Sequence, residues 1–244
     1  MPRFFVAASN IFGGMALVSG KEAEHMRVLR IRQGETFTIC DGKGNDYICQ
    51  ISGEEENGIR AEILETVPSA GEAAVQCSVY AAFSKGDKME TVVQKCVELG
   101  AYEIVAFPSC RCVSKPDGAA VLKKTNRWQK IAEEAAKQSG RGIVPQVWTV
   151  PSFDEAVKRA SQAELPLFFY EEEREHSIKA ALEEKPAAKT VSILTGPEGG
   201  FEPEEAEKAK AGGMVSASLG PRILRCETAP VSALTAVMFF TGNM

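Results

Sequence analysis

Apolar and polar positions alternate in two different ways along the chain, and the change falls near residue 70. Within residues 1–70, the β-prone runs 37–40 and 47–51 flank a turn-rich segment, 41–46, which is typical of a hairpin connection. A stretch containing Pro, Ser and Gly follows at 68–71 and indicates a linker. The pattern predicts a small β-barrel domain that ends near residue 70.

The remainder of the chain predicts buried strands that alternate with helices. Short apolar runs separated by stretches with helical spacing are typical of a parallel sheet with crossover helices. The expected strands are 75–83, 104–107, 165–170, 191–195 and 215–219. The expected helices are 88–99, 119–139, 153–163, 203–211 and 228–240. The predicted fold class is therefore α/β, with a barrel domain over 1–70 and a parallel-sheet domain over 71–244.

Composition is that of an ordinary globular protein and limits the chemistry that we expect. Of the 244 residues, 44% are hydrophobic and 25% are charged, and only 2 are His. The 7 Cys form no C-x-x-C pairs, which argues against a disulfide framework and a zinc ribbon and indicates a reducing cytoplasm. We also expect no metal. The longest apolar stretch, 231–240, is far shorter than the roughly 20 residues of a membrane span, so we expect no transmembrane helix.

The net charge of −5 argues against a uniformly basic nucleic-acid-binding protein, but basic residues gather in the middle of the chain. Residues 111–141 contain eight basic and three acidic residues. Such a cluster is typical of a solvated helix face or of a phosphate-binding surface. Charge alone favours the solvated face.

The segment 194–201, Leu-Thr-Gly-Pro-Glu-Gly-Gly-Phe, lies between an expected buried strand and an expected helix. Ligands of open α/β sheets bind beyond the carboxyl ends of the strands, and glycine lets a backbone approach a ligand closely. The segment matches neither the dinucleotide fingerprint nor the P-loop. A tight turn that needs a positive φ explains the same glycines without a ligand, so the pattern leaves both explanations open.

A second Gly-Pro loop follows the next expected strand, at 218–230. It continues with two arginines, Arg222 and Arg225, and with Glu227-Thr228 at the start of an expected helix. Loops at successive strand ends would form two walls of one pocket. A surface ion pair is the alternative for the Arg and Glu residues, but their clustering in a loop with glycine favours a functional site.

Other conspicuous side chains have structural explanations. The helical spacing of Trp128 favours core packing over base stacking. His176 lies in an acidic run and is predicted at the surface. His25 belongs either to a solvated helix end or to an RNA-contacting strip with its basic neighbours, which are Arg27, Arg30 and Arg32.

Short motifs from the first residues to the last helix add up to a family pattern. They are Met1-Pro2-Arg3-Phe4-Phe5, His25-x-x-x-Leu29-Arg30, Gln94-Lys95-x-x-Glu98-Leu99-Gly100, Ser109-x-Arg111, Arg127-Trp128, Ala135-x-x-Gln138-Ser139-x-Arg141, 195–201 and 219–229. Together they resemble the RsmE family of SPOUT methyltransferases, which methylate N3 of a uridine in small-subunit (16S) ribosomal RNA. The last two motifs are highly specific. Cys226 departs from the family, which often has Thr or another small residue there.

The resemblance implies a PUA-like RNA-binding barrel over 1–70 and a SPOUT domain over 71–244 whose end forms a deep trefoil knot, a rare exception to unknotted folds. It implies the cofactor S-adenosyl-L-methionine and a uridine target near the decoding region. Small-subunit ribosomal RNA, or the assembled subunit, is the implied partner. The protein is expected to be a cytoplasmic homodimer that binds no membrane. The implied cofactor-binding residues are Leu194, Thr195, Gly196, Pro197, Glu198, Gly199, Gly200, Leu219, Gly220, Ile223, Leu224, Thr228 and Ala229.

The methylation of uridine N3 sets the catalytic roles that we expect. N3 must lose its proton while negative charge spreads onto the neighbouring carbonyl oxygens. Arg222 and Arg225 are candidates for stabilising negative charge on the base or on a phosphate, and Glu198 or Glu227 for positioning or proton removal. The expected RNA-binding residues are Arg3, His25, Arg27, Arg30, Arg32, Arg111, Lys115, Arg127, Gln138 and Arg141.

The sequence leaves two alternative functions open. One is a SPOUT methyltransferase that acts on a transfer RNA ribose 2′-oxygen, and the other is a non-catalytic RNA-binding factor of ribosome assembly. Composition alone is also consistent with a non-RNA enzyme that uses a nucleotide cofactor. Binding of S-adenosylmethionine would separate the catalytic from the non-catalytic alternative.

Overall fold

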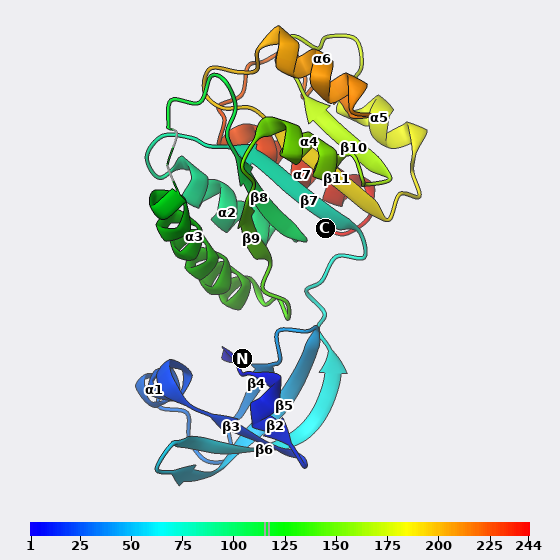
Figure 1. Ribbon diagram of the computed structural model, residues 1–244. Coiled ribbons are helices and arrows are strands. Elements are labelled where there is room, and N and C mark those ends of the chain that lie inside the picture. Colours follow the sequence, from blue (N-terminus) through cyan, green and yellow to red (C-terminus); the bar gives the residue numbers. More distant parts are fainter. Residues whose placement is uncertain (115, 117) are drawn as a thin grey trace. The chain divides into compact units, whose positions relative to one another are not determined.

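The computed structural model describes residues 1–114, 116 and 118–244. The chain folds into two compact units (Figure 1). The first contains Met1–Glu72 and Ala136–Val144, and the second contains Ala73–Ala135 and Pro145–Met244. The sequence division at residue 70 does not include the second segment of the first unit, which holds the last turn of a long helix and the residues after it.

The first unit is built on a six-stranded sheet with the strand order β1-β4-β5-β6-β3-β2. Its strands are β1 (Arg3–Phe5), β2 (Ile11–Phe12), β3 (Met15–Val18), β4 (Thr36–Cys40), β5 (Asn45–Glu55) and β6 (Gly58–Pro68). A 3₁₀ turn, η1 (Ala8–Asn10), and one helix, α1 (Gly20–Leu29), complete the unit. The hairpin expected around residues 41–46 joins β4 to β5, and the Asp41 carboxylate accepts the N–H groups of Lys43 and Asn45 within it. Phe4, Met26 and Phe37 are fully buried in its core.

The second unit contains a six-stranded sheet with the order β12-β10-β11-β7-β8-β9, in which every pairing is parallel. Its strands are β7 (Gln76–Ala82), β8 (Glu103–Phe107), β9 (Gln146–Thr149), β10 (Leu165–Phe169), β11 (Thr190–Thr195) and β12 (Val215–Ala217). Its helices are α2 (Lys88–Glu98), α3 (Gly118–Ser139), α4 (Phe153–Ala160), α5 (Ile178–Glu184), α6 (Pro203–Ala211) and α7 (Thr228–Phe240). The predicted α/β fold with a parallel sheet is confirmed. The short elements β9 and α5 were not predicted.

Helices cover both faces of this sheet. Helices α4 and α6 pack together, and α4 lies on β7, β8 and β11. Helix α7 packs on β7 and β11 together with α2 and α5, and Figure 1 shows it behind the strands when α4 is in front. The apolar sequence of α7 suits this position, because Leu234 and Val237 are fully buried.

Local signals fix where the helices begin. The Ser152 side chain caps α4 by accepting a hydrogen bond from the Glu155 N–H. Pro203 occupies the first turn of α6, where a missing N–H costs nothing, and Glu202 and Glu205 form a capping box there.

The strand order brings several loops together at the carboxyl ends of the strands. The chain passes from β11 to β12 across β10, and the register pairs Phe169 with both Thr195 and Ala217. The carboxyl ends of β10, β11 and β12 therefore meet, at a place where α/β sheets bind ligands. The trefoil knot implied by the resemblance stays a prediction. Within the described residues, no helix combines the length and the apolar character needed to cross a bilayer.

Candidate active site

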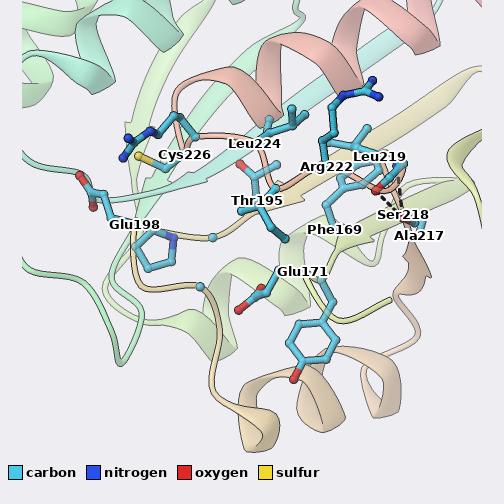
Figure 2. Close-up of a pocket in the computed structure, with 18 of the residues that line it drawn as sticks. Phe169, Glu171, Thr195, Glu198, Ala217, Ser218, Leu219, Arg222, Leu224 and Cys226 are labelled. Carbon is cyan, nitrogen blue, oxygen red and sulfur yellow. Dashed lines mark hydrogen bonds between the residues drawn. The ribbon is translucent and has the colours of Figure 1, made fainter. Parts of the chain in front are cut away.

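A cavity of about 510 Å³ lies at the carboxyl ends of β10, β11 and β12 (Figure 2). This volume lies in the range of small-molecule and cofactor sites. The loop after each of these strands contributes residues to the lining of the cavity. The lining residues are Phe169, Tyr170, Glu171, Arg174, Thr195, Gly196, Pro197, Glu198, Gly199, Gly200, Ala217, Ser218, Leu219, Gly220, Arg222, Ile223, Leu224, Arg225, Cys226 and Ala229.

The structure places most of the expected cofactor-binding residues around this one cavity. Two of them lie elsewhere: Leu194 is fully buried in β11, and Thr228 is exposed at the start of α7. Side chains alternate between the two faces of a strand, so Leu194 packs in the core while its neighbour Thr195 reaches the cavity. Motif matching alone did not separate these positions.

Each glycine of the loop after β11 leaves space for another part of the protein. A Cβ atom on Gly196 would lie 3.0 Å from the Phe201 ring, and one on Gly199 would lie 2.9 Å from the Arg111 Cβ. Gly200 has a φ of +70°, and a Cβ there would lie 1.7 Å from the Glu171 Oε1. Close packing therefore explains all three glycines, and a positive φ adds a second reason at Gly200.

The loop after β10 is a third wall that the sequence reasoning missed. Glu171 lines the cavity, and its Oε1 accepts a hydrogen bond from the Phe201 N–H at 2.9 Å. The Phe201 ring is buried against Phe168, with ring centroids 4.8 Å apart. The end of the expected strand 165–170 was an available signal, but the acidic, glycine-free run after it resembled ordinary surface. His176 in that run is half-buried, with Nδ1 2.9 Å from the Ser216 carbonyl oxygen.

Lys88 joins the two Gly-Pro loops at one side of the cavity. Its Nζ lies 3.1 Å from the Glu198 Oε1 and 3.6 Å from the Glu227 Oε2. The Lys85 N–H also donates to the Glu198 Oε1, at 2.9 Å. The Cys226 Sγ donates to the Glu227 Oε2 at 3.2 Å. In Figure 2, Glu198 and Cys226 lie together, on the opposite side of the cavity from Arg222.

These contacts fix the charges of the cluster. Partial burial opposes ionisation of Glu198, but the Lys85 N–H and the Lys88 ammonium outweigh it and hold the pKa of Glu198 below its ordinary value. The backbone N–H of Glu227, the Cys226 thiol and Lys88 likewise lower the pKa of Glu227 despite some burial. Burial and the neighbouring carboxylates raise the pKa of Cys226 to about 12. At neutral pH the cluster around Lys88 therefore holds two carboxylates, one ammonium and an unreactive thiol.

Arg222 and Arg225 have exposed side chains that line the same cavity. In the part of the chain that the structure describes, neither guanidinium has a hydrogen-bond or ion-pair partner. Both are therefore available to an anionic group that enters the cavity. The alternative explanation for these arginines, a surface ion pair with a carboxylate of their own loop, is not found among the described residues.

Two of the expected RNA-binding residues are internal to the first unit. Arg3 forms a two-point contact with Asp46, at 2.7 and 2.8 Å, and its side chain is 17% exposed. Arg141 is 4% exposed and forms an ion pair with Glu72 at 2.7 Å. A phosphate could reach either guanidinium only by breaking a shielded ion pair. These contacts do not favour a role of the two arginines in RNA binding, which stays a prediction.

The other expected RNA-binding residues have different surroundings. Arg27 and Arg127 are exposed and form ion pairs with Glu54 at 3.8 Å and Glu90 at 2.8 Å. The ring of His25 packs edge-on against Phe4. Lys115 lies outside the described residues. The remaining exposed positions of the set are Arg30, Arg32, Arg111 and Gln138.

Family models match both parts of the chain. A family model described as an RNA methyltransferase domain matches residues 71–238, and one described as an RNA methyltransferase PUA domain matches residues 18–64. Ribosomal RNA small subunit methyltransferase E of Bacillus subtilis is 33% identical over 92% of this chain and 90% of its own length. The protein of that name from Mycobacterium tuberculosis is 33% identical over 98% of this chain and 92% of its length.

Solved structures agree with the sequence matches. A crystal structure of ribosomal RNA small subunit methyltransferase E from Neisseria gonorrhoeae bound to S-adenosyl methionine has a TM-score of 0.82 and 31% identity, covering 98% of this chain and 97% of that one. A putative methyltransferase from Legionella pneumophila in complex with bound SAM has a TM-score of 0.82 and 29% identity, covering 97% and 96%. The resemblance in the sequence motifs is thereby confirmed, and the chain belongs to the ribosomal RNA small subunit methyltransferase E (RsmE) family of RNA methyltransferases.

Proposed function

We propose that this protein transfers a methyl group from S-adenosylmethionine to N3 of a uridine in small-subunit ribosomal RNA, near the decoding region. One observation carries the proposal: the cavity formed by the glycine-containing loops after β11 and β12, in a chain of this family. The similar structure from N. gonorrhoeae, which is bound to S-adenosyl methionine, supports the choice of cofactor.

The residues of the cavity fit this cofactor. Phe169, Leu219 and Leu224 offer apolar surface to an adenine ring, and the peptide groups of 196–200 offer hydrogen-bond donors and acceptors. Gly220 has a φ of +104°, and a Cβ there would meet no atom within 4 Å, so the loop leaves open space at this point. The carboxylates of Glu171 and Glu198 complement a positively charged sulfur. When bound, S-adenosylmethionine supplies an electrophilic methyl group.

We assign Arg222 and Arg225 to the charge that develops on the acceptor. Uracil that loses the N3 proton carries negative charge on its carbonyl oxygens, and fixed cations beside those oxygens lower the barrier. The two exposed guanidinium groups, which have no partner among the described residues, can serve the base or a neighbouring phosphate.

We assign Glu198 and Glu227 to positioning. Their pKa values lie below the ordinary value for Glu, which makes both carboxylates weak proton acceptors. Lys88 links them, so together they hold the two Gly-Pro loops that line the cavity.

We propose that the first domain, 1–70, binds RNA and that 71–244 carries out methyl transfer. The target base must be unpaired or flipped out, because N3 takes part in Watson–Crick pairing. Exposed Arg27, Arg30, Arg32 and Arg127 are the candidates for backbone phosphates. We further propose a cytoplasmic homodimer. The 78% exposure of the apolar Phe239 side chain on α7 supports the dimer.

A gene deletion tests the function. Ribosomal RNA from the deletion strain is digested to nucleosides and its small-subunit fraction is analysed for 3-methyluridine by mass spectrometry. We expect the modification to disappear and to return with the wild-type gene but not with Arg225→Ala. Persistence of 3-methyluridine in the deletion strain would overturn the proposal. Loss of a ribose methylation instead would favour a 2′-oxygen target.

A further inference from the structure

The loop after β8 contacts the exit of the glycine loop through a buried carboxylate. Glu205 is 4% exposed. It accepts hydrogen bonds from the Ser109 Oγ at 3.0 Å, the Cys110 N–H at 3.0 Å and the Glu202 N–H at 3.1 Å. Several donors compensate the cost of burying a carboxylate. The start of α6 is therefore fixed to a loop from a strand that does not border β11.

Arg111 extends this connection to the wall of the cavity. Its Nε and Nη2 lie 2.8 and 2.9 Å from the two carboxylate oxygens of Glu202. Its Nη1 donates to the Gly199 carbonyl oxygen at 3.2 Å. The space above Gly199 is filled by the Arg111 Cβ, since a Cβ on Gly199 would lie 2.9 Å from it. A two-point Arg–carboxylate contact is one of the few exposed ion pairs with a defined geometry.

The opposite side of the same loop is held by Glu171. Its Oε1 accepts the Phe201 N–H and fills the space above Gly200. Gly199 and Gly200 line the cavity, but Arg111 does not. Arg111 therefore acts on the cavity through the loop, from its outer side, and its charge is already neutralised by Glu202.

We propose that Arg111 is a positioning residue that holds the glycine loop in its ligand-binding shape, and that it is not an RNA contact. The proposal rests on the proposed function, because it assigns this loop to S-adenosylmethionine. A loop that is ordered before binding loses less conformational freedom when the ligand arrives. A phosphate, by contrast, would have to displace a two-point carboxylate contact from Arg111.

The test compares Arg111→Met and Arg111→Lys with a matched control, Lys208→Met. Lys208 lies on α6 and forms an exposed ion pair with Asp154 at 3.4 Å, and neither residue lines the cavity. Three quantities are measured on the full chain: the Kd for S-adenosylmethionine, the Kd for small-subunit ribosomal RNA as a function of salt, and amide hydrogen exchange at Gly200 and Phe201 without ligand. Glu202→Gln keeps the side-chain shape but removes the carboxylate that pairs with Arg111, so it tests the same contact from the other side.

We expect Arg111→Met and Glu202→Gln to weaken the binding of S-adenosylmethionine about tenfold, equivalent to about 1.4 kcal/mol. Both variants should also speed amide hydrogen exchange at Gly200 and Phe201. Arg111→Lys should fall between wild type and Met, and Lys208→Met should match wild type. The RNA affinity and its salt dependence should not change.

Two results would overturn the positioning role. One is unchanged cofactor affinity and exchange in Arg111→Met. The other is weaker RNA binding with a salt slope smaller by about one, which marks a lost phosphate contact. If the wild-type protein fails to bind S-adenosylmethionine, the proposed function fails, while the exchange rates of the ligand-free variants still decide whether Arg111 orders the loop.

Discussion

The Lys88 Nζ lies 3.1 Å from the Glu198 Oε1, so the first residue of α2 is tied to the glycine loop after β11. The same ammonium reaches Glu227, at the end of the other loop that encloses the cavity. One side chain from a helix outside the lining thus connects two walls that are distant in sequence.

Replacing Lys88 with Met should loosen the cavity without unfolding the protein. The substitution removes the ammonium that Glu198 and Glu227 share, so the two loops lose this contact and their like charges repel each other. We expect several-fold weaker binding of S-adenosylmethionine by calorimetry and a small change in thermal stability. Lys179→Met is the control, because Lys179 is 77% exposed in a helical ion pair with Glu183. Equal affinities for the Lys88 variant and wild type would contradict the role.

Replacing Gly200 with Ala should distort the glycine loop. The alanine must adopt a positive φ, which costs about 1–2 kcal/mol, and its Cβ overlaps the Glu171 carboxylate. Gly213→Ala separates these effects, since Gly213 has a φ of +90° and open space around its Cβ position. We expect both variants to lose stability in urea unfolding but only Gly200→Ala to lose cofactor affinity. A loss of affinity in both would show that the collision with Glu171 is irrelevant.

The Arg3–Asp46 pair should make the stability of the first unit sensitive to acid. Partial burial opposes ionisation of Asp46, but Arg3 and the Ser69 hydroxyl outweigh it and hold its pKa below the ordinary value. The group binds more protons when unfolded, so its stabilisation is complete above about pH 4 and is lost as the pH falls through the lower folded value. Urea unfolding between pH 7 and pH 3 measures this loss of stability. Asp46→Asn should flatten this dependence, whereas Asp154→Asn, in an exposed pair, should leave it intact.

Replacing Arg141 should lower the stability of the protein, whereas replacing Arg127 should weaken RNA binding. Arg141→Met leaves Glu72 without its partner in a shielded position, and we expect a loss of about 2 kcal/mol in the free energy of unfolding. Arg127→Met removes an exposed charge, so we expect a stability change within about 0.5 kcal/mol, weaker RNA binding and a salt slope reduced by about one. The reverse assignment of effects would restore Arg141 as a phosphate contact.

The sequence predicted the parts of the site that depend on backbone geometry. Gly196, Gly199 and Gly200 stand out because few other residues tolerate such close packing, and strand periodicity places them at a sheet edge. The sequence did not predict the role of Glu171, because this role depends on β10 lying beside β11. Local sequence patterns do not show which strands are neighbours.

Charge patterns were the least informative part of the sequence. The basic run 111–141 contains Arg111, which contacts Glu202, and Arg141, which contacts Glu72, alongside exposed Arg127. Nothing in the order of residues distinguishes a guanidinium paired with a carboxylate from one that faces solvent, because each partner comes from a distant position in the chain.

The Glu72 carboxylate also accepts the N–H groups of Gly142 and Ile143, and Arg3 donates to the Arg141 carbonyl oxygen at 3.4 Å. These contacts join the first strand to residues that a ribosome translates only after β7, β8 and most of α3. The amino-terminal unit therefore cannot reach its final form as it leaves the exit tunnel. A fragment that ends at Glu72 would lack the N–H groups of Gly142 and Ile143 that donate to the Glu72 carboxylate. The first unit is therefore expected to complete its folding only after most of the second unit has been synthesised.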